Sequence, residues 1–102
     1  MTKVVHCKKE PYDVYIGRPS KWGNPFSHII DKETLAEYVV ADRESAVNFY
    51  EAYLIKQILS GKISREEVLE LDGKTLGCWC HPQYCHGDAI VRVINMIKLG
   101  EI

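Results

Sequence analysis

The stretch of sequence that decides the fold is residues 75–88, which read TLGCWCHPQYCHGD. Its pattern predicts a strand over residues 74–80, a short turn containing Pro82, and a helix that begins at about Asp88. The stretch holds three of the four cysteines and two of the four histidines of the chain. Polar residues gathered where a strand passes into a helix commonly form a site in α/β proteins, because backbone N–H groups at a helix start can bind a ligand. We therefore expect the functional site at this strand-to-helix turn.

Two further strands are predicted upstream, over residues 3–8 and residues 12–16, where valine, isoleucine and tyrosine recur. Their short connection favours a β-hairpin. Residues 17–28 then form an irregular loop, because Pro19 and Pro25 cannot take part in a regular strand ladder. This loop also carries arginine, tryptophan and asparagine, so it is either a functional element or an elaborate turn.

Helices are predicted downstream of this loop. The longest covers residues 43–59 with Asp42 as its N-cap. A capping box at Ser64 opens a short helix that ends near Leu71, and the last helix covers residues 88–99. The longest helix has one apolar stripe, which consists of Ala46, Tyr50, Tyr53, Leu54 and Ile58.

The part of the chain before the longest helix is ambiguous, since residues 32–38 fit a short helix and residues 38–40 fit a short strand. Neither a repeat nor a linker divides the sequence of 102 residues, of which 46% are hydrophobic and 26% charged. This composition is typical of one soluble globular domain. We predict a single small α/β domain over residues 1–102, with a short sheet on which helices pack.

Charge and hydropathy exclude some classes of function. The formal net charge is -1, so any contact with nucleic acid requires a local basic patch. No apolar run is long enough to span a membrane, and residues 1–5 lack the features of a signal peptide. We therefore expect a cytoplasmic protein with no membrane partner, in which free, reactive or metal-bound thiols are favoured over disulfides.

The first chemical interpretation of the cluster places an anion or a thiolate at the helix start. The helix dipole there stabilises negative charge and lowers the pKa of a thiol. Cys85 would act as the nucleophile, His86 or His81 as the acid or base, and Asp88 as the N-cap or an orienting carboxylate. Backbone near Gly87 would approach the ligand, and Arg18 from the upstream loop would hold its charge.

The second chemical interpretation is a zinc site. Thiolates and imidazole are good zinc ligands, and four of them make a closed tetrahedral site. The spacing departs from the usual pairs of cysteines separated by two residues. The ligands in this alternative would be Cys78, Cys80, Cys85 and His86.

A structural interpretation of the same residues stands beside these two. Cys78 fits a buried core position, and Asp88 fits a plain N-cap. Trp79 alternates with the cysteines, which favours core packing on the other face of the strand over base stacking. His6 and Cys7 lie on a predicted strand and are expected to pack rather than to bind a ligand. The density of cysteine and histidine in the cluster argues against a purely structural role.

Two motifs carry a resemblance to a known family. The first reads YDVYIGR over residues 12–18 and WGNPF over residues 22–26; the second reads GKTLGCWC over residues 73–80, with Pro82 and CHGD over residues 85–88. Together they resemble the family labelled "domain of unknown function 4326", found in phages, bacteria and archaea. The resemblance covers essentially the whole chain and implies a stand-alone phage or prokaryotic domain, placed in the host cytoplasm if a phage encodes it. It implies no activity, but it adds weight to Arg18, Trp22, Asn24, Cys80, Cys85, His86 and Asp88.

The sequence is also similar, more weakly, to the family labelled "domain of unknown function 488". Members of that family have a cysteine, a proline-containing turn and Cys-His-Arg entering a helix. Gly87 stands here in place of that arginine, so an anion clamp at this position is missing. Arg18 is the candidate to replace it.

These observations favour a nucleotide- or nucleic-acid-linked enzyme or binder that holds an anionic ligand. Residues 17–26 and residues 78–88 should meet at one edge of the sheet. The predicted catalytic residues are Cys85, His86 and Asp88, and the predicted ligand-binding residues are Arg18, Trp22, Asn24, Cys80 and Gly87. The alternatives are a zinc-stabilised interaction module and a phage protein that binds and inhibits a host factor. The tyrosine-rich helix over residues 43–59 is also compatible with a homodimer.

Overall fold

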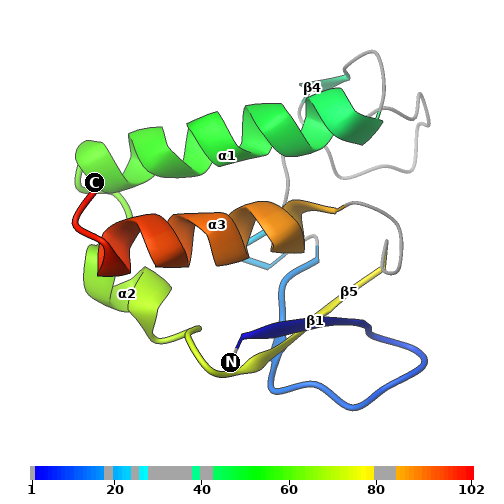
Figure 1. Cartoon of the computed structure of the whole chain (residues 1–102). Coiled ribbons are helices and arrows are strands. Elements are labelled where there is room, and N and C mark those ends of the chain that lie inside the picture. Colours follow the sequence, from blue (N-terminus) through cyan, green and yellow to red (C-terminus); the bar gives the residue numbers. More distant parts are fainter. Residues whose placement is uncertain (1, 18–19, 24–25, 28–37, 40–42, 80–84) are drawn as a thin grey trace.

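The computed structural model describes residues 2–17, 20–23, 26–27, 38–39, 43–79 and 85–102 (Figure 1). The elements within this part are the strands β1 (Lys3–His6), β2 (Val14–Tyr15), β3 (Phe26–Ser27), β4 (Tyr38–Val39) and β5 (Thr75–Cys78), and the helices α1 (Arg43–Leu59), α2 (Arg65–Leu69) and α3 (His86–Lys98). Several predictions fall outside the described residues: the helix alternative over residues 32–38 except for residue 38, the N-cap Asp42, and the site residues Arg18, Asn24 and Cys80. The strand alternative over residues 38–40 is confirmed for Tyr38–Val39, which form β4.

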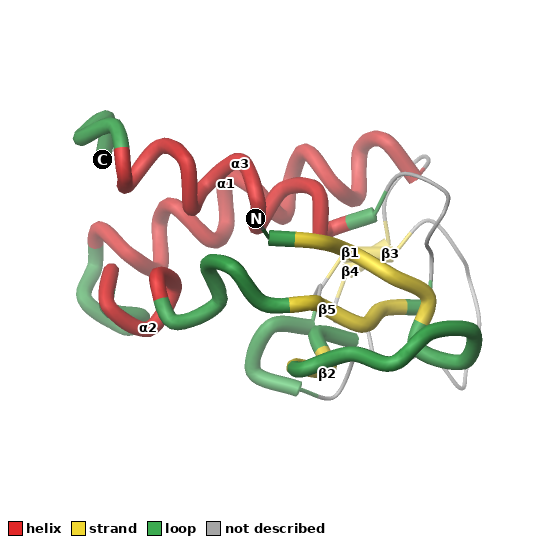
Figure 2. The backbone as a smooth tube through the Cα atoms, turned by 60° about the horizontal axis from the view of Figure 1, so that its bottom comes forward, coloured by secondary structure: helices red, strands yellow, loops and turns green. Residues whose placement is uncertain are grey.

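The strand β5 is the centre of a parallel sheet with the order β1-β5-β2 (Figure 2). Val4 and Val14 both pair with Leu76, one from each side. The predicted hairpin of the first two strands is therefore wrong, because they run in the same direction and β5 separates them. The main chain of Asp13 donates to the carbonyl of Thr75 at 2.8 Å, and the Asp13 carboxylate accepts from the Thr75 N–H at 2.8 Å. These contacts attach the start of β2 to β5 rather than to β1. A second parallel pair joins β3 and β4.

The helices α1 and α3 build the core on one face of this sheet, and Figure 1 shows α3 between α1 and β1. The predicted stripe of α1 is confirmed as the buried side of that helix, with Tyr53 partly buried. Strand β5 contributes two fully buried side chains to the core, Leu76 and Cys78. Helix α3 contributes a broad apolar face, which consists of Ala89, Ile90, Val93 and Ile94. In the described part of the chain, none of the helices is long and apolar enough to cross a membrane.

The connection between α1 and β5 follows its sequence signals closely. Ser64 accepts from the Glu67 N–H at 3.0 Å and its own N–H donates to the Glu67 carboxylate at 3.0 Å, which confirms the capping box. Gly61 and Gly73 have φ of 83° and 79°, a backbone conformation that favours glycine. The short helix ends at Leu69, slightly earlier than predicted, and the chain then turns into β5.

The glycine in the middle of β5 is required by close packing on the face opposite the helices. Leu76 and Cys78 face the core, so Gly77 faces the other way, where the ring of Tyr12 covers it. A Cβ atom at Gly77 would lie 2.6 Å from Cγ and 3.1 Å from Cβ of Tyr12, near the root of that side chain. The connection from β1 to β2 therefore passes over the outer face of the sheet.

Replacing Gly77 by alanine is expected to lower the free energy of unfolding by about 1–3 kcal/mol, because the ring of Tyr12 must move. Urea denaturation of the variant measures this loss. The double variant with Tyr12→Ala should recover part of it, since the obstructing ring is then absent. A loss below about 0.5 kcal/mol in the single variant would contradict the packing described here.

Candidate ligand site at the carboxyl edge of the sheet

The two sequence motifs contain the adjacent parallel strands β2 and β5 and continue past the carboxyl ends of these strands. Ile16, directly after β2, is fully buried and donates its N–H to the carbonyl of Gly77 at 2.9 Å. Its own carbonyl lies 2.6 Å from Nε2 of His86, the first residue of α3. Ile16, the residue before the predicted loop, and the start of α3 therefore meet at this sheet edge. The predicted meeting of residues 17–26 with residues 78–88 stays a prediction, since Arg18 and Asn24 lie outside the described residues.

His86 acts as a structural brace at this edge. A carbonyl oxygen can only accept a hydrogen bond, so Nε2 of His86 carries the proton and donates it to Ile16. His86 is 7% exposed, and its ring makes a T-shaped contact with the ring of Tyr50, with the ring centroids 5.1 Å apart. This nitrogen is thus already engaged, and a catalytic role for His86 stays a prediction.

The start of α3 differs from the predicted one. The helix begins at His86, with Cys85 as its N-cap in extended geometry (φ −142°, ψ 170°), and Asp88 is the third helical residue. The Asp88 carboxylate accepts from the Cys85 N–H at 3.0 Å, and the Cys85 sulfur accepts from the Gly87 N–H at 3.3 Å. Asp88 is the far half of a capping box rather than the N-cap. The spacing of Cys85 and Asp88 could have revealed this box, but cysteine is not among the residues usually expected at an N-cap.

Cys85 is paired with the thiol of Cys78, and the two sulfur atoms lie 3.1 Å apart. Both side chains are buried in the core. The hydrogen bond with Cys78, together with burial, raises the pKa of the Cys85 thiol above its ordinary value, although the Gly87 N–H works in the opposite direction. The sequence predicted a lowered pKa from the helix dipole. Burial beside a second thiol outweighs the dipole at this position, which disfavours a thiolate nucleophile.

The reactivity of the thiols follows from this burial. Cys7 lies in a turn and is partly exposed, whereas Cys78 and Cys85 are buried. Alkylation of the native protein at about pH 8 should modify Cys7 at least about tenfold faster than Cys85. Peptide mass spectrometry at successive times measures both rates. Equal rates for the two cysteines, in a protein shown to be folded, would contradict the buried thiol pair.

The zinc alternative receives mixed support. The two buried thiols are neighbours, but two thiolates on one tetrahedral zinc ion lie about 3.8 Å apart, farther than this pair. His86 uses Nε2 for the Ile16 carbonyl, and Cys80 lies outside the described residues. Within the described ranges, no group of three or more His, Cys, Asp or Glu side chains is placed to hold a metal ion.

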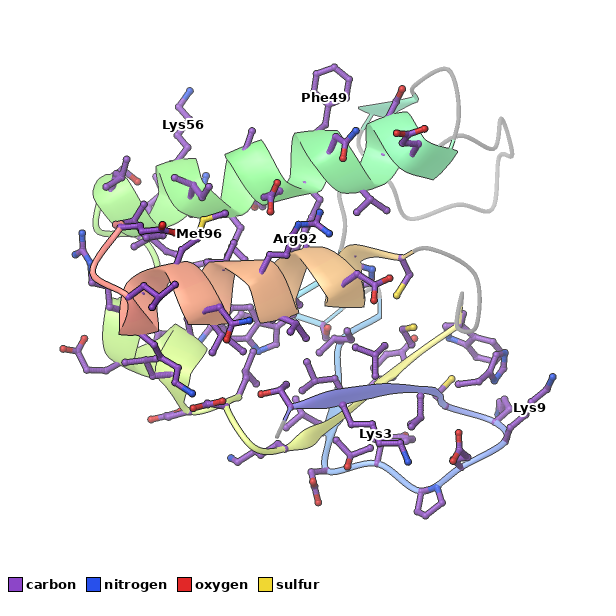
Figure 3. The ribbon with its side chains drawn as sticks, viewed as in Figure 1. Lys3, Lys9, Phe49, Lys56, Arg92 and Met96 are labelled. Atoms are coloured by element: carbon purple, nitrogen blue, oxygen red, sulfur yellow. The ribbon has the colours of Figure 1, made fainter. Side chains whose placement is uncertain are left out.

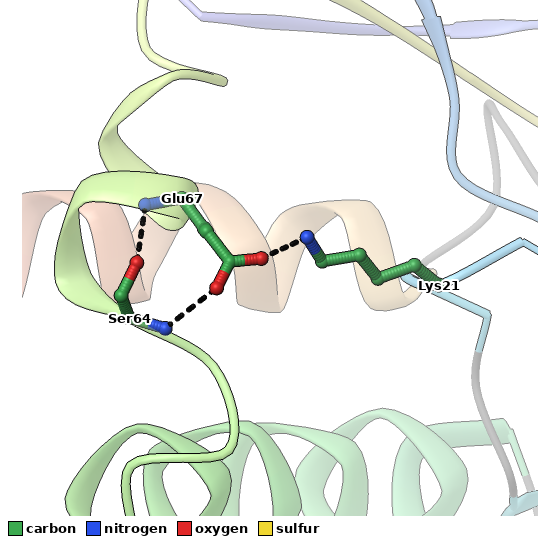
Figure 4. Close-up of polar contacts among 3 residues, drawn as sticks. All are labelled: Lys21, Ser64 and Glu67. Carbon is green, nitrogen blue, oxygen red and sulfur yellow. Dashed lines mark hydrogen bonds and ion pairs between the residues drawn. The ribbon is translucent and has the colours of Figure 1, made fainter.

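The loop after β2 is fastened to the helices at residues 20–23. Trp22 is 7% exposed, and its carbonyl accepts from the Tyr50 hydroxyl at 2.9 Å. Lys21 donates to the carboxylate of Glu67 in the capping box of α2 (Figure 4), which lowers the pKa of Glu67. The buried indole of Trp22 packs in the core, so the predicted contact of this ring with a ligand stays a prediction.

Gly87 brings α3 close to the sheet. A Cβ atom at this position would lie 2.9 Å from Cγ1 of Val4 and 3.1 Å from Cδ1 of Ile16. Its glycine identity is therefore explained by packing of the helix start against β1 and the end of β2. A ligand contact by its backbone stays a prediction.

The predicted core position of Trp79 is wrong, and the sequence did not indicate its contacts with Tyr15 and Lys8. The side chain is 54% exposed rather than packed in the core, because the face of β5 opposite Cys78 is not covered by a helix. Its Nε1 donates to the hydroxyl of Tyr15 at 2.7 Å, and Nζ of Lys8 lies 5.3 Å from the ring centroid. The alternation of side chains along β5 shows that Trp79 and Cys78 lie on opposite faces of the strand. It does not show which of these faces is covered by other parts of the protein.

The fold and the strand-to-helix site define a small α/β domain with a parallel sheet whose two motifs meet at the carboxyl edge. The chain belongs to the family described as "Domain of unknown function (DUF4326)", whose model matches residues 2–96. It is similar to an uncharacterized 12.4 kDa protein in the nrdA-td intergenic region of Enterobacteria phage T4, with 33% identity over 97 residues that cover 95% of this chain and 81% of that protein. No solved structure matches the chain. The family resemblance drawn from the two motifs is confirmed.

Proposed function

We propose that the domain binds a nucleotide, held through its phosphate, at the carboxyl edge of the parallel sheet. The observation that carries this proposal is the hydrogen bond from His86 to the Ile16 carbonyl, which joins the two motifs at adjacent strand ends. Ligands of open α/β sheets bind outside the carboxyl ends of the strands, where side chains from neighbouring loops converge. Both motifs continue past this edge.

In this proposal the predicted site residues have different roles. The N–H groups of Cys85 and Gly87 are already satisfied within the cap of α3, and His86 donates to the main chain. These residues form a rigid side of the proposed site and do not contact the ligand through these groups. The charge of the ligand is then held by Arg18 and the amide of Asn24 supplies a further polar contact, both from the loop after β2. Because the pKa of Cys85 is raised, this proposal favours a binder over an enzyme with a cysteine nucleophile.

Titration calorimetry with nucleoside mono-, di- and triphosphates, and with inorganic phosphate alone, tests this function. The variant Arg18→Ala should weaken binding by at least about tenfold, since a charge-assisted hydrogen bond is lost. Lys56→Ala on α1 is the matched control for removal of a cation, and it should bind as the wild type does. Binding that is unchanged by Arg18→Ala, or absent for every nucleotide, would overturn the proposal.

A zinc-stabilised interaction module is a second candidate, supported by the neighbouring sulfur atoms of Cys78 and Cys85. Metal content by mass spectrometry separates it from nucleotide binding. About one zinc per chain, lost in Cys85→Ser, is the result that this candidate requires. A metal-free protein with full nucleotide affinity would eliminate it.

A further inference from the structure

Four aromatic side chains, from the end of β1, from β2 and the residues before it, and from the residue after β5, form a connected surface. This aromatic surface consists of His6, Tyr12, Tyr15 and Trp79. His6 meets Trp79 edge to face at a centroid distance of 5.8 Å, and the rings of Tyr12 and Tyr15 are 6.2 Å apart. The hydrogen bond from Trp79 to Tyr15 links the two pairs. Tyr12 is 43% exposed and Trp79 54% exposed, so broad aromatic area faces solvent.

The rings are held in place before any ligand arrives. The Nε1 donor of Trp79 is used by Tyr15, and Tyr12 is seated over Gly77. A fixed ring loses little conformational freedom when it stacks against a partner. Proteins that bind single-stranded nucleic acid stack unpaired bases on exposed aromatic side chains, because every base has a π face.

Cations lie beside these rings. The turn after β1 carries Lys8 and Lys9, both exposed, and Nζ of Lys8 stands over the indole of Trp79. Figure 3 shows Lys9 extending from the same turn away from the ribbon. The chain as a whole has a net charge of -1, and Lys8 and Lys9 supply local positive charge for contacts with phosphate groups. Lys3, nearby on β1, is paired with Glu10 at 3.8 Å.

The topology of the sheet places this surface where a ligand is expected. The chain leaves β1 over the outer face, past Gly77, whereas it leaves β5 to enter α3 on the helical face. Adjacent strands whose connections depart to opposite faces define the switch point of an open sheet. His6 ends β1, and Trp79 directly follows β5, so both lie at this point.

We propose that the aromatic surface binds single-stranded nucleic acid, with bases stacked on Trp79 and Tyr12 and the phosphates held by Lys8 and Lys9. Stacking uses the π face that every base offers, and the Nε1 donor of Trp79 is already used by Tyr15. Binding is therefore indifferent to sequence and similar for DNA and RNA. This stacking does not depend on Arg18 or on the proposed phosphate site.

Fluorescence anisotropy of a labelled thymidine oligonucleotide of about 12 residues tests the proposal, at about 50 mM salt and protein up to about 100 μM. Wild-type protein should bind, and a uridine oligoribonucleotide should bind within a few-fold. Trp79→Ala should weaken binding at least about tenfold, and Lys8→Ala about threefold with a shallower salt dependence. Phe49→Ala removes an aromatic side chain that is 53% exposed on α1, and this control should bind as the wild type does.

Circular dichroism checks that each variant is folded, and Tyr12→Ala replaces Trp79→Ala if the latter is not. Quenching of tryptophan emission adds a direct readout, because Trp22 is buried and Trp79 is the exposed indole. No binding by the wild type, equal binding by Trp79→Ala, or a preference for duplex DNA would each overturn the proposal. If Trp79→Ala loses oligonucleotide binding but keeps nucleotide binding, the aromatic surface is separate from the proposed Arg18 site.

Discussion

Replacing Tyr50 by alanine is expected to lower the free energy of unfolding by about 4 kcal/mol, the largest loss among the substitutions considered. Tyr50 is 1% exposed on α1, and three parts of the molecule meet at its side chain. Its ring packs against Tyr53 and against the edge of His86, and its hydroxyl donates to the Trp22 carbonyl at 2.9 Å. Truncation leaves a cavity between α1 and the start of α3 and an unsatisfied carbonyl in the loop after β2. Urea denaturation followed by circular dichroism measures the loss.

The hydroxyl group of Tyr50 can be separated from its ring. Tyr50→Phe keeps the ring but leaves the Trp22 carbonyl unpaired, so it should lose about 1–2 kcal/mol. Tyr12→Phe removes a hydroxyl from a side chain that is 43% exposed, and this control should change stability by less than about 0.5 kcal/mol. Equal losses in the two variants would show that the buried hydrogen bond contributes little.

Tyr50 also gives the stability a dependence on alkaline pH. Burial raises the pKa of Tyr50 in the folded state above its ordinary value of 10.0. Its contribution is therefore fully present below about pH 10 and is lost as the pH rises further, because the unfolded chain releases this proton first. The slope from one proton is about 1.4 kcal/mol per pH unit. Stability measured from pH 8 to pH 11 should fall less steeply in Tyr50→Phe than in the wild type, and parallel curves would contradict this assignment.

The second large effect is expected at His86. His86→Ala should lower the free energy of unfolding by about 3 kcal/mol, since it empties a buried site beside Tyr50 and leaves the Ile16 carbonyl without its donor. His86→Phe restores the ring but not the donor, so it isolates the hydrogen bond. Hydrogen exchange adds a local readout: the amides of Ile16, Ser20 and Gly23, which are hydrogen-bonded, should lose protection more than those of α2. A loss below about 1 kcal/mol in His86→Ala would contradict the role of this residue as a brace.

Much of the fold could be predicted because local signals were strong. The bounds of α1 followed from the stripe that includes Tyr50 and Leu54, and the start of α2 followed from the spacing of Ser64 and Glu67. The strand order could not be predicted in this way. The short link between the first two strands suggested a hairpin, whereas the register depends on Asp13 meeting Thr75, a contact between residues far apart in sequence.

The site shows the same division between local and long-range information. The sequence located the cluster and predicted that residues 17–26 and 78–88 meet. The contact of His86 with Ile16 joins the cluster to the residue before that loop, and the meeting of the loop itself with the cluster stays a prediction. It assigned a lowered pKa to Cys85 from the helix dipole alone, since nothing local shows that Cys78 lies 3.1 Å away. It placed Trp79 in the core because alternation identifies two faces of a strand, but tertiary packing decides which face is covered.

Chemical-shift mapping of the backbone amides during a titration with a nucleoside triphosphate tests the central claim most directly. We predict that the perturbed amides are those at the carboxyl edge, among them Gly17, Trp79 and His86, and that amides on the exposed side of α1 around Phe49 and Lys56 do not change. Shifts confined to α1, or no shifts at millimolar nucleotide, would contradict a nucleotide site at the junction of the two motifs.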